Sequence, residues 1–149
     1  MSSVPVVLAA LAELARATLP QSQVINGGES SVETTTGRLL LIGDDEIVIE
    51  RQFDSMSTAS TSEEYVVPLR AAVDLATRKQ TDADAQAFAD YEALVQAILD
   101  HPSGPSLGLE ASGVLSVLPV GSHRFGRTAD PDGRQSTVRF TVRVYAQLS

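Results

Sequence analysis

The residues of this chain that are best suited to recognition chemistry are arginines in two stretches of alternating polarity. Arg139 and Arg143 are four residues apart in one stretch, and Arg70 occupies the polar side of the other. A guanidinium binds carboxylates and phosphates through paired hydrogen bonds and is enriched at protein interfaces. Two interpretations follow. Either the arginines belong to a solvated sheet face whose charges discourage aggregation, or they contact acidic groups of a neighbouring copy.

No residues have the spacing of a known catalytic or metal site. Cysteine is absent, and the only histidines, His101 and His123, do not belong to a metal-binding pattern. Gly27 and Gly28 are not followed by the lysine and helix of a phosphate-binding loop. We therefore expect no cofactor, no metal and no enzyme activity. The enzymatic alternative is a small hydrolase that uses His123 together with a carboxylate.

The acidic residues lie mainly in turns and helix starts. Asp44, Asp45 and Glu46 form one acidic turn, which lacks the ligand number and spacing of a calcium loop. The formal net charge of −8 argues against a surface built to neutralise phosphates. It is compatible with a surface along which DNA moves without binding.

Length and composition predict one domain spanning residues 1–149. The chain is 43% hydrophobic and 20% charged, which is typical of a globular protein. No apolar run reaches about 18 residues, so we expect no membrane span. The apolar run near the N-terminus lacks a basic flank and is interrupted by Glu13 and Arg16. We therefore interpret it as mature protein rather than a signal peptide.

Two stretches alternate strictly and predict long strands. In residues 136–148 the apolar parity comprises Val138, Phe140, Val142, Val144, Ala146 and Leu148. In residues 65–77 it comprises Tyr65, Val67, Leu69, Ala71, Val73 and Leu75. Pro68 cannot donate a ladder hydrogen bond, so this second strand should have an edge or a bulge near its start.

Shorter patterns predict the remaining strands and loops. Residues 23–25 and 114–120 resemble short strands, and residues 38–42 and 46–51 resemble a hairpin. Residues 52–64 form the longest segment without an apolar period, in which Phe53 and Met56 could serve as anchors. Residues 121–135 resemble a long polar connection with a turn at 130–133.

Two segments have helical spacing. In the first, Ser2 or Ser3 is the expected cap, Pro20 ends the helix, and the apolar stripe comprises Val7, Leu8, Leu11, Leu14 and Ala15. In the second, Thr81 is the expected cap with Asp84 three residues on, and the stripe comprises Phe88, Tyr91, Val95, Ile98 and Leu99. The order of elements predicts an α+β fold, a mostly antiparallel sheet with two helices packed on one face and long polar loops.

The chain also resembles a known family in the order and length of its elements. The features that carry the resemblance are the aliphatic N-terminal helix, the stretch VVPLRAAVDLAT before an acidic-capped helix, the sequence His123-Arg124-Phe125, and the closing stretch STVRFTVRVYAQL. Together they resemble the tail terminator (tail completion) proteins of long-tailed bacteriophages, the lambda gpU-like family.

The resemblance implies a structural virion protein without cofactors. Such proteins form hexameric rings that cap the head-proximal end of the tail tube and stop its polymerisation. The ring offers a surface to the head-completion (neck) protein, and DNA passes through the lumen without sequence-specific contact. The expected location is the neck region of the virion tail after assembly in the host cytoplasm, with no membrane contact. The alternatives are a tail-tube or head-tail connector subunit, or a monomeric module that binds a partner strand at the edge of the terminal strand.

On this resemblance, two groups of residues are candidates for contacts. The candidates for subunit or tail-tube contacts are Phe53, Met56, Arg70, Arg124, Arg127, Arg139 and Arg143. The acidic candidates for the lumen are Asp44, Asp45, Glu63 and Glu64.

Overall fold

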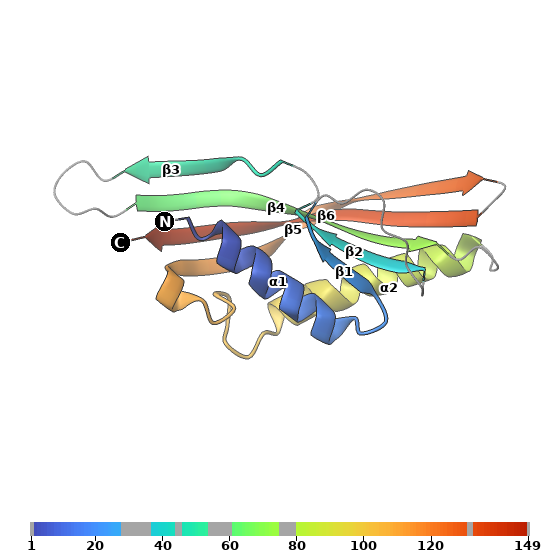
Figure 1. The fold of residues 1–149 in the computed structure, drawn as a ribbon, viewed down its shortest axis with the longest axis horizontal. Helices are drawn as coiled ribbons and strands as arrows, with labels where there is room; N and C mark the ends of the chain where they lie inside the picture. The colour runs from blue at the N-terminus through green and yellow to red at the C-terminus, as the bar shows by residue number, and fades with distance from the viewer. Residues whose placement is uncertain are drawn as a thin grey trace.

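Six strands and two helices make up the fold in the computed structural model, which describes residues 2–27, 37–43, 46–53, 61–74, 80–130 and 133–148 (Figure 1). The helices are α1 (Val4–Thr18) and α2 (Gln80–Leu99), with a short 3-10 helix η1 (Glu110–Ser112). The strands are β1 (Gln23–Asn26), β2 (Arg38–Ile42), β3 (Ile49–Phe53), β4 (Thr61–Asp74), β5 (Val114–Asp130) and β6 (Gly133–Leu148). The predicted α+β fold with two helices and a mostly antiparallel sheet is confirmed.

The centre of the sheet is the antiparallel pair β4 and β6, which is in register from Thr61↔Leu148 to Asp74↔Gln135. The strand order is β1-β2-β4-β6-β5, with β3 also paired to β4, and only β1 with β2 is parallel. The predicted terminal strand is therefore correct, but it is not an edge. Because β4 and β5 flank β6 on both sides, the alternative of strand addition to β6 is wrong.

The predicted hairpin between residues 38–42 and 46–51 is wrong. β2 and β3 do not pair with each other; both pair antiparallel with β4, β2 along one half and β3 along the other. Gly43, at φ +66°, follows β2 and donates its N–H to the Pro68 carbonyl. A strand of 14 residues is long enough to accept two short partners in succession, so the chain continues along β4.

Pro68 lies in the interval between these two partners. β2 pairs from Leu69 onward and β3 pairs up to Tyr65, so no described residue is a ladder partner of β4 on that flank from residue 66 to residue 68. The N and carbonyl of one strand residue point to the same flank, and the Pro68 carbonyl meets Gly43 there. The missing N–H of Pro68 therefore interrupts no ladder, as the predicted edge position required.

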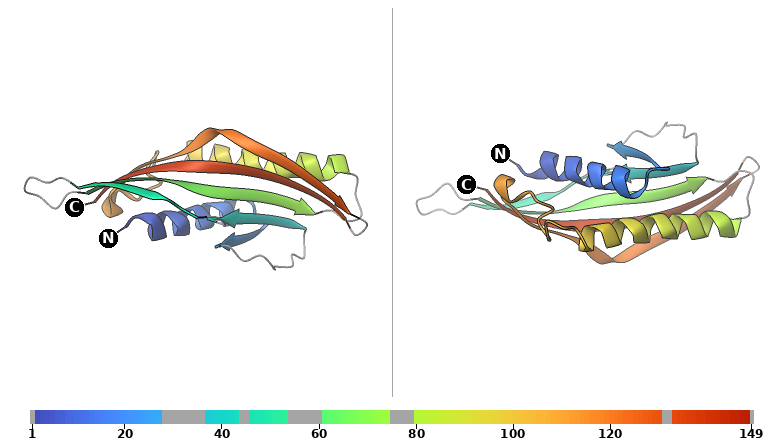
Figure 2. Two further views of the ribbon diagram at one scale, coloured as in Figure 1. Left: turned by 90° about the horizontal axis from the view of Figure 1, so that it is seen from above. Right: turned by 90° about the horizontal axis from the view of Figure 1, so that it is seen from below.

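The described parts of two predicted loops are strand. The described ends of the predicted loop 52–64 belong to β3 and β4, which pair from Ile49↔Tyr65 to Phe53↔Thr61. The predicted connection 121–135 lies in the long arms of β5 and β6, which pair up to Asp130↔Gly133. A register shift between Pro119 and His123 bends β5 outward (Figure 2). The predicted reversal near residues 130–133 is confirmed by the closing pair of the ladder.

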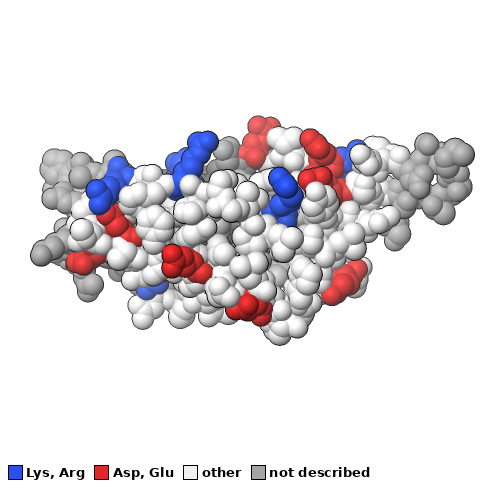
Figure 3. All heavy atoms as spheres, turned by 180° about the vertical axis from the view of Figure 1, so that it is seen from behind, with Lys and Arg blue, Asp and Glu red and all other residues white. Residues whose placement is uncertain are grey.

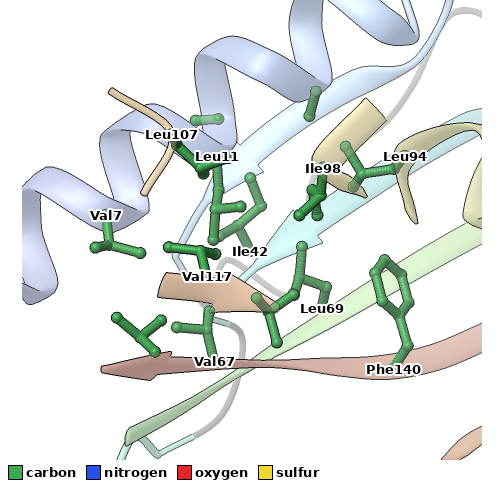
Figure 4. Close-up of a cluster of buried hydrophobic side chains, with 14 of the residues drawn as sticks. Val7, Leu11, Ile42, Val67, Leu69, Leu94, Ile98, Leu107, Val117 and Phe140 are labelled. Carbon is green, nitrogen blue, oxygen red and sulfur yellow. The ribbon is translucent and has the colours of Figure 1, made fainter. Parts of the chain in front are cut away.

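The core lies between one face of the sheet and both helices (Figure 4). On the sheet side, the core is lined by the predicted apolar parity of β4. Its members Tyr65, Val67, Leu69, Ala71 and Val73 are all buried. On β6, the buried residues of that parity are Val138, Phe140, Val142, Val144 and Ala146. From α1, the fully buried side chains are Val7, Leu11, Ala12 and Ala15, and Leu8 and Leu14 pack against them at the margin.

The buried stripe of α2 is rotated from the predicted one. It comprises Ala83, Ala87, Asp90, Leu94 and Ile98. Leu99 is 56% exposed, so its predicted place in the stripe is wrong. The small alanines let the helix approach the sheet closely. Asp90 is kept in the stripe by Arg38, whose guanidinium donates to Asp90 Oδ1 at 2.6 Å. Thr81, the predicted cap, is already inside the helix.

The sheet is strongly twisted, so its two ends face different directions. In Figure 1, β3 is the uppermost strand at one end of the sheet and β5 is uppermost at the other end. Both helices contact the same sheet face, yet α1 and α2 lie on opposite sides in the views of Figure 2. This follows from the accumulated right-handed twist of long strands.

Candidate interaction surface

The candidate functional surface is the sheet face that is turned away from the helices. We call it the open face, and it is formed by β4 residues of the parity of Glu64 and Arg70, β6 residues of the parity of Arg139 and Arg143, and their neighbours on β3 and β5. No helix of the described chain lies against it. Its side chains are mostly polar, as the predicted alternation required.

One half of the open face carries a row of arginines. The ladder places Arg70 opposite Arg139 and Arg139 opposite Arg124, so three guanidinium-bearing residues lie side by side on adjacent strands. They border a hollow of about 360 Å³, which Gln135 and Thr137 also line. Arg124 and Arg139 are exposed and form no ion pair with any residue of the described ranges. Like charges directly opposite each other destabilise a sheet.

The other half of the open face carries an acidic pocket of about 460 Å³. Glu46, Glu50 and Glu64 line it, and Glu50 lies directly opposite Glu64 in the ladder. Arg143 is the basic residue of this pocket, with its Nε 3.8 Å from Glu64 Oε1. A hydrogen bond with Glu64 raises the pKa of Tyr145 on the same face. Three glutamates against one arginine leave this half net negative.

Within one chain, Glu64 of the acidic half is too far from the arginine row to neutralise it. Glu64 and Arg70 are six residues apart on β4, which corresponds to roughly 20 Å. The Debye length in physiological salt is about 8 Å. Each half therefore keeps its own sign. Seen from behind, the upper rim of the molecule carries basic side chains toward the left and mainly acidic side chains further to the right (Figure 3).

Arg127, a predicted contact residue, lines the same hollow but does not belong to the arginine row. Its guanidinium binds Asp84 at the start of α2, on the helix side of the sheet. Hydrogen bonding with Arg127 lowers the pKa of Asp84 to about 2, and Ser136 and Gln80 donate to the same carboxylate. The role visible for Arg127 is therefore to hold α2 against the β5–β6 arm.

Glu63 is the clearest correction among the acidic candidates. It was expected to face a lumen, but it is 1% exposed and lies on the helix side of β4. Ser3 donates to Glu63 Oε1 from its backbone N at 2.9 Å and from its Oγ at 2.6 Å, and Arg51 binds Oε2 at 3.0 Å. Burial alone would raise the pKa of Glu63, but the hydrogen bonds from Ser3, Ser2 and Arg51 outweigh it and hold the pKa below its usual value.

This buried carboxylate fixes the start of α1. The N-terminus of a helix carries partial positive charge and unsatisfied N–H groups, which favour an anion. The expected serine cap takes an unusual form, because the Ser3 hydroxyl meets Glu63 and also Tyr65 Oη at 2.9 Å instead of capping its own helix. Burial raises the pKa of Tyr65 to about 12, so its hydroxyl stays protonated and able to donate.

The other predicted contact residues are scattered or lie outside the described part. Phe53 is 73% exposed at the end of β3. Met56, Asp44 and Asp45 lie outside the described residues. Glu64 is on the open face with its side chain 40% exposed.

His123 belongs to an aromatic cluster. Its ring centroid is 4.8 Å from that of Tyr91 and 6.2 Å from that of Phe88, and Phe125 lies 5.0 Å from Phe88. The hydrogen-bonding partners of His123 are Tyr91 Oη and the Gly121 carbonyl. The carboxylate that the hydrolase alternative needs is not among them within the described chain.

Neither a metal-binding cluster nor a membrane-spanning helix is found in the part of the chain that the structure describes. No three histidine, aspartate or glutamate side chains of that part are grouped so that they could bind an ion. Neither described helix has the length and hydropathy needed to cross a bilayer.

Comparison with protein-family models found no match to this chain, and comparison with curated protein sequences found none either.

Sequence reasoning missed two features of this surface that the register reveals. The acidic pocket was missed because residues 46–51 were paired with the wrong strand, so Glu50 and Glu64 were not seen as neighbours. Arg124 was named, but its position beside Arg139 depends on the register shift in β5. The burial of Glu63 could be predicted from the sequence, since Glu63 shares the parity of Tyr65 and Val67.

Proposed function

We propose that this chain is a structural assembly protein of a long-tailed bacteriophage. In this proposal, copies close into a ring that caps the head-proximal end of the tail tube, stops tube polymerisation and offers a surface to the neck protein. The observation that carries it is the arginine row on the open face of an otherwise acidic chain. A surface with three adjacent arginines is suited to bind carboxylates of another subunit.

The arrangement of the sheet supports an assembly role in a second way. β3 is exposed at all five positions and, among the described residues, pairs with β4 on one flank only. Together with the exposed Val48 and Phe53, it offers contact area at one end of the molecule. Head-to-tail contacts between different surfaces generate closed rings when the rotation between copies closes.

The acidic character of the chain supports passage of DNA through such a ring. The net charge is −8, and repeated acidic subunits repel phosphates instead of retaining them. Among the acidic candidates for the lumen, Glu63 is excluded by its burial, and Glu64 lines the acidic pocket of the open face.

The experiment that tests the proposal is electron microscopy of virions made with and without the chain. Gold-labelled antibody against the chain should mark the head-proximal end of the tail. Particles made without it should have tails of uncontrolled length that fail to join heads. Tails of normal length that join heads in its absence would contradict the proposal, and label along the whole tail would indicate a tube subunit instead.

A second candidate function is a monomeric module that binds an extended peptide. The observation that favours it is the exposed β3, whose outer flank has no partner strand within the described residues. Edge strands of this kind accept a partner strand through main-chain hydrogen bonds. A chain that stays monomeric and binds one extended peptide through β3 would favour this function.

A further inference from the structure

The open face carries two oppositely charged halves, and each half is strained by like charges within itself. Arg139 lies directly opposite Arg124, and Glu50 lies directly opposite Glu64. Each pairing costs free energy in the isolated sheet, and in the acidic half Arg143, 3.8 Å from Glu64, offsets part of that cost. The separation of roughly 20 Å between Glu64 and Arg70 keeps the Glu64 carboxylate from relieving the arginine row in the same chain.

We propose that the arginine row of one copy binds the acidic pocket of the next copy. This inference rests on the proposed function and names the contact by which its ring would close. The partner is a second copy because the acidic pocket carries the charge that complements the arginine row, and both surfaces belong to the same chain. Opposite potentials that meet across an interface give specificity and fix the register.

The twist of the sheet makes the contact head-to-tail. Because the strand order is inverted between the two ends of the sheet in Figure 1, the two halves of the open face point in different directions. One copy can therefore present its arginine row to one neighbour and its acidic pocket to another. Such a heterologous contact leaves one free half at each end until the assembly closes.

The acidic pocket also offers apolar area for this contact. Val48 is 70% exposed beside the glutamates, and Val66 and Pro68 line the pocket floor. Across β6, Leu118 and Tyr145 are 46% and 43% exposed. A central apolar patch bordered by charged residues is the usual composition of a specific interface.

The test uses two variants that each remove one half. The basic-half variant carries Arg124→Gln and Arg139→Gln, and the acidic-half variant carries Glu50→Gln and Glu64→Gln. A control variant, Glu13→Gln with Glu92→Gln, removes two exposed acidic charges from the helices. Circular dichroism checks that all of them fold, and light scattering after size exclusion measures the mass of each at up to about 0.5 mM.

We expect the wild-type chain and the control variant to form complexes of more than two chains. Each one-sided variant should associate at least about tenfold more weakly. Mixed in equal amounts, the two variants should form pairs and nothing larger, because each retains one intact half. A wild-type chain that remains a monomer, a wild-type complex of only two chains, one-sided variants that associate as the wild type does, or a mixture that stays monomeric would each overturn the inference.

Failure of the inference can be separated from failure of the proposed function. If both one-sided variants still cap tails of normal length in virions, the pairing is wrong while the terminator role stands. If the variants behave as expected in solution but virions without the chain have normal tails, the pairing stands and the terminator role is wrong.

Discussion

At the scale of single residues, the buried carboxylate of Glu63 connects the sheet to the start of α1. The Glu63 carboxylate accepts hydrogen bonds from Ser2 and Ser3 and forms an ion pair with Arg51, all at 3.2 Å or less. The predicted loop over residues 52–64 gave no reason for an acid at this buried position. The alternation of β4 gives one, because Glu63 precedes Tyr65 by two residues and therefore lies on the same face of the strand.

Replacing Glu63 by glutamine should destabilise the fold by about 2 kcal/mol. The amide keeps the shape but loses the charge, and its NH₂ group faces donors on Ser3 and Arg51. Urea denaturation measures the free energy of unfolding. The matched control is Glu92→Gln, an exposed glutamate of α2, which should change it by less than about 0.5 kcal/mol. Equal effects of the two substitutions would contradict the assigned burial of Glu63.

The Asp84 carboxylate should make the fold acid-sensitive through its contact with Arg127. Its pKa in the folded chain is about 2, below the usual 3.8, so the folded state binds this proton less readily than the unfolded state. The stabilisation is therefore present above about pH 4 and is lost as the pH falls toward 2.

Comparing wild type with Asp84→Asn isolates this contribution. Because other carboxylates titrate in both chains, the difference in unfolding midpoint should be large at pH 6 and should shrink as the pH approaches 2. A difference that stays constant over this range would show that Asp84 is not held in its charged form by Arg127.

At the scale of elements, the close approach of η1 to β6 depends on Gly113. This residue has φ +84°, its carbonyl accepts from Gln147 N at 2.8 Å, and an added Cβ would collide with the Gln147 carbonyl oxygen. Gly113→Ala should therefore lower the free energy of unfolding by about 2–4 kcal/mol. Gly121→Ala is the control, because a Cβ added there would have no atom within 4 Å, and it should be nearly neutral. Thermal melts of the two variants give the comparison, and similar melts would argue against the close contact.

The sequence predicted elements well where one physical signal dominated. Strict alternation placed the buried faces of β4 and β6 correctly, because a strand with one face in the core tolerates few exceptions. Alternation did not predict which strands pair with each other. The Gly-Asp-Asp turn signal suggested a hairpin, but the length of β4 let β2 and β3 pair with it in succession.

The long arm of β5 was missed for a different reason. Beyond Pro119 the strand extends past the aliphatic core, so its inward side is covered by Phe88 and by the ion pair of Arg127 with Asp84. Aromatic and charged contacts do not produce the aliphatic alternation by which a buried strand is recognised in a sequence. The arginine row could be predicted only in part, because the neighbours of Arg139 depend on strand register.

At the scale of the whole molecule, the proposed assembly depends on an open face that has one basic half and one acidic half. The helices cover one face of the sheet, and the other carries charge of one sign at each end. If association runs through these charges, it should weaken as salt rises, because exposed charges more than a Debye length apart are screened. Association carried by the apolar residues alone would be unchanged or strengthened by salt.

Whether the open face binds further copies is decided by the mass of the purified wild-type chain in solution at low and high ionic strength. Light scattering between about 10 and 500 µM should show the mass rising in steps above the 15.8 kDa of one chain in low salt, and falling back toward it near 1 M salt. A mass of 15.8 kDa at every concentration and salt level would contradict the claim that the open face binds further copies.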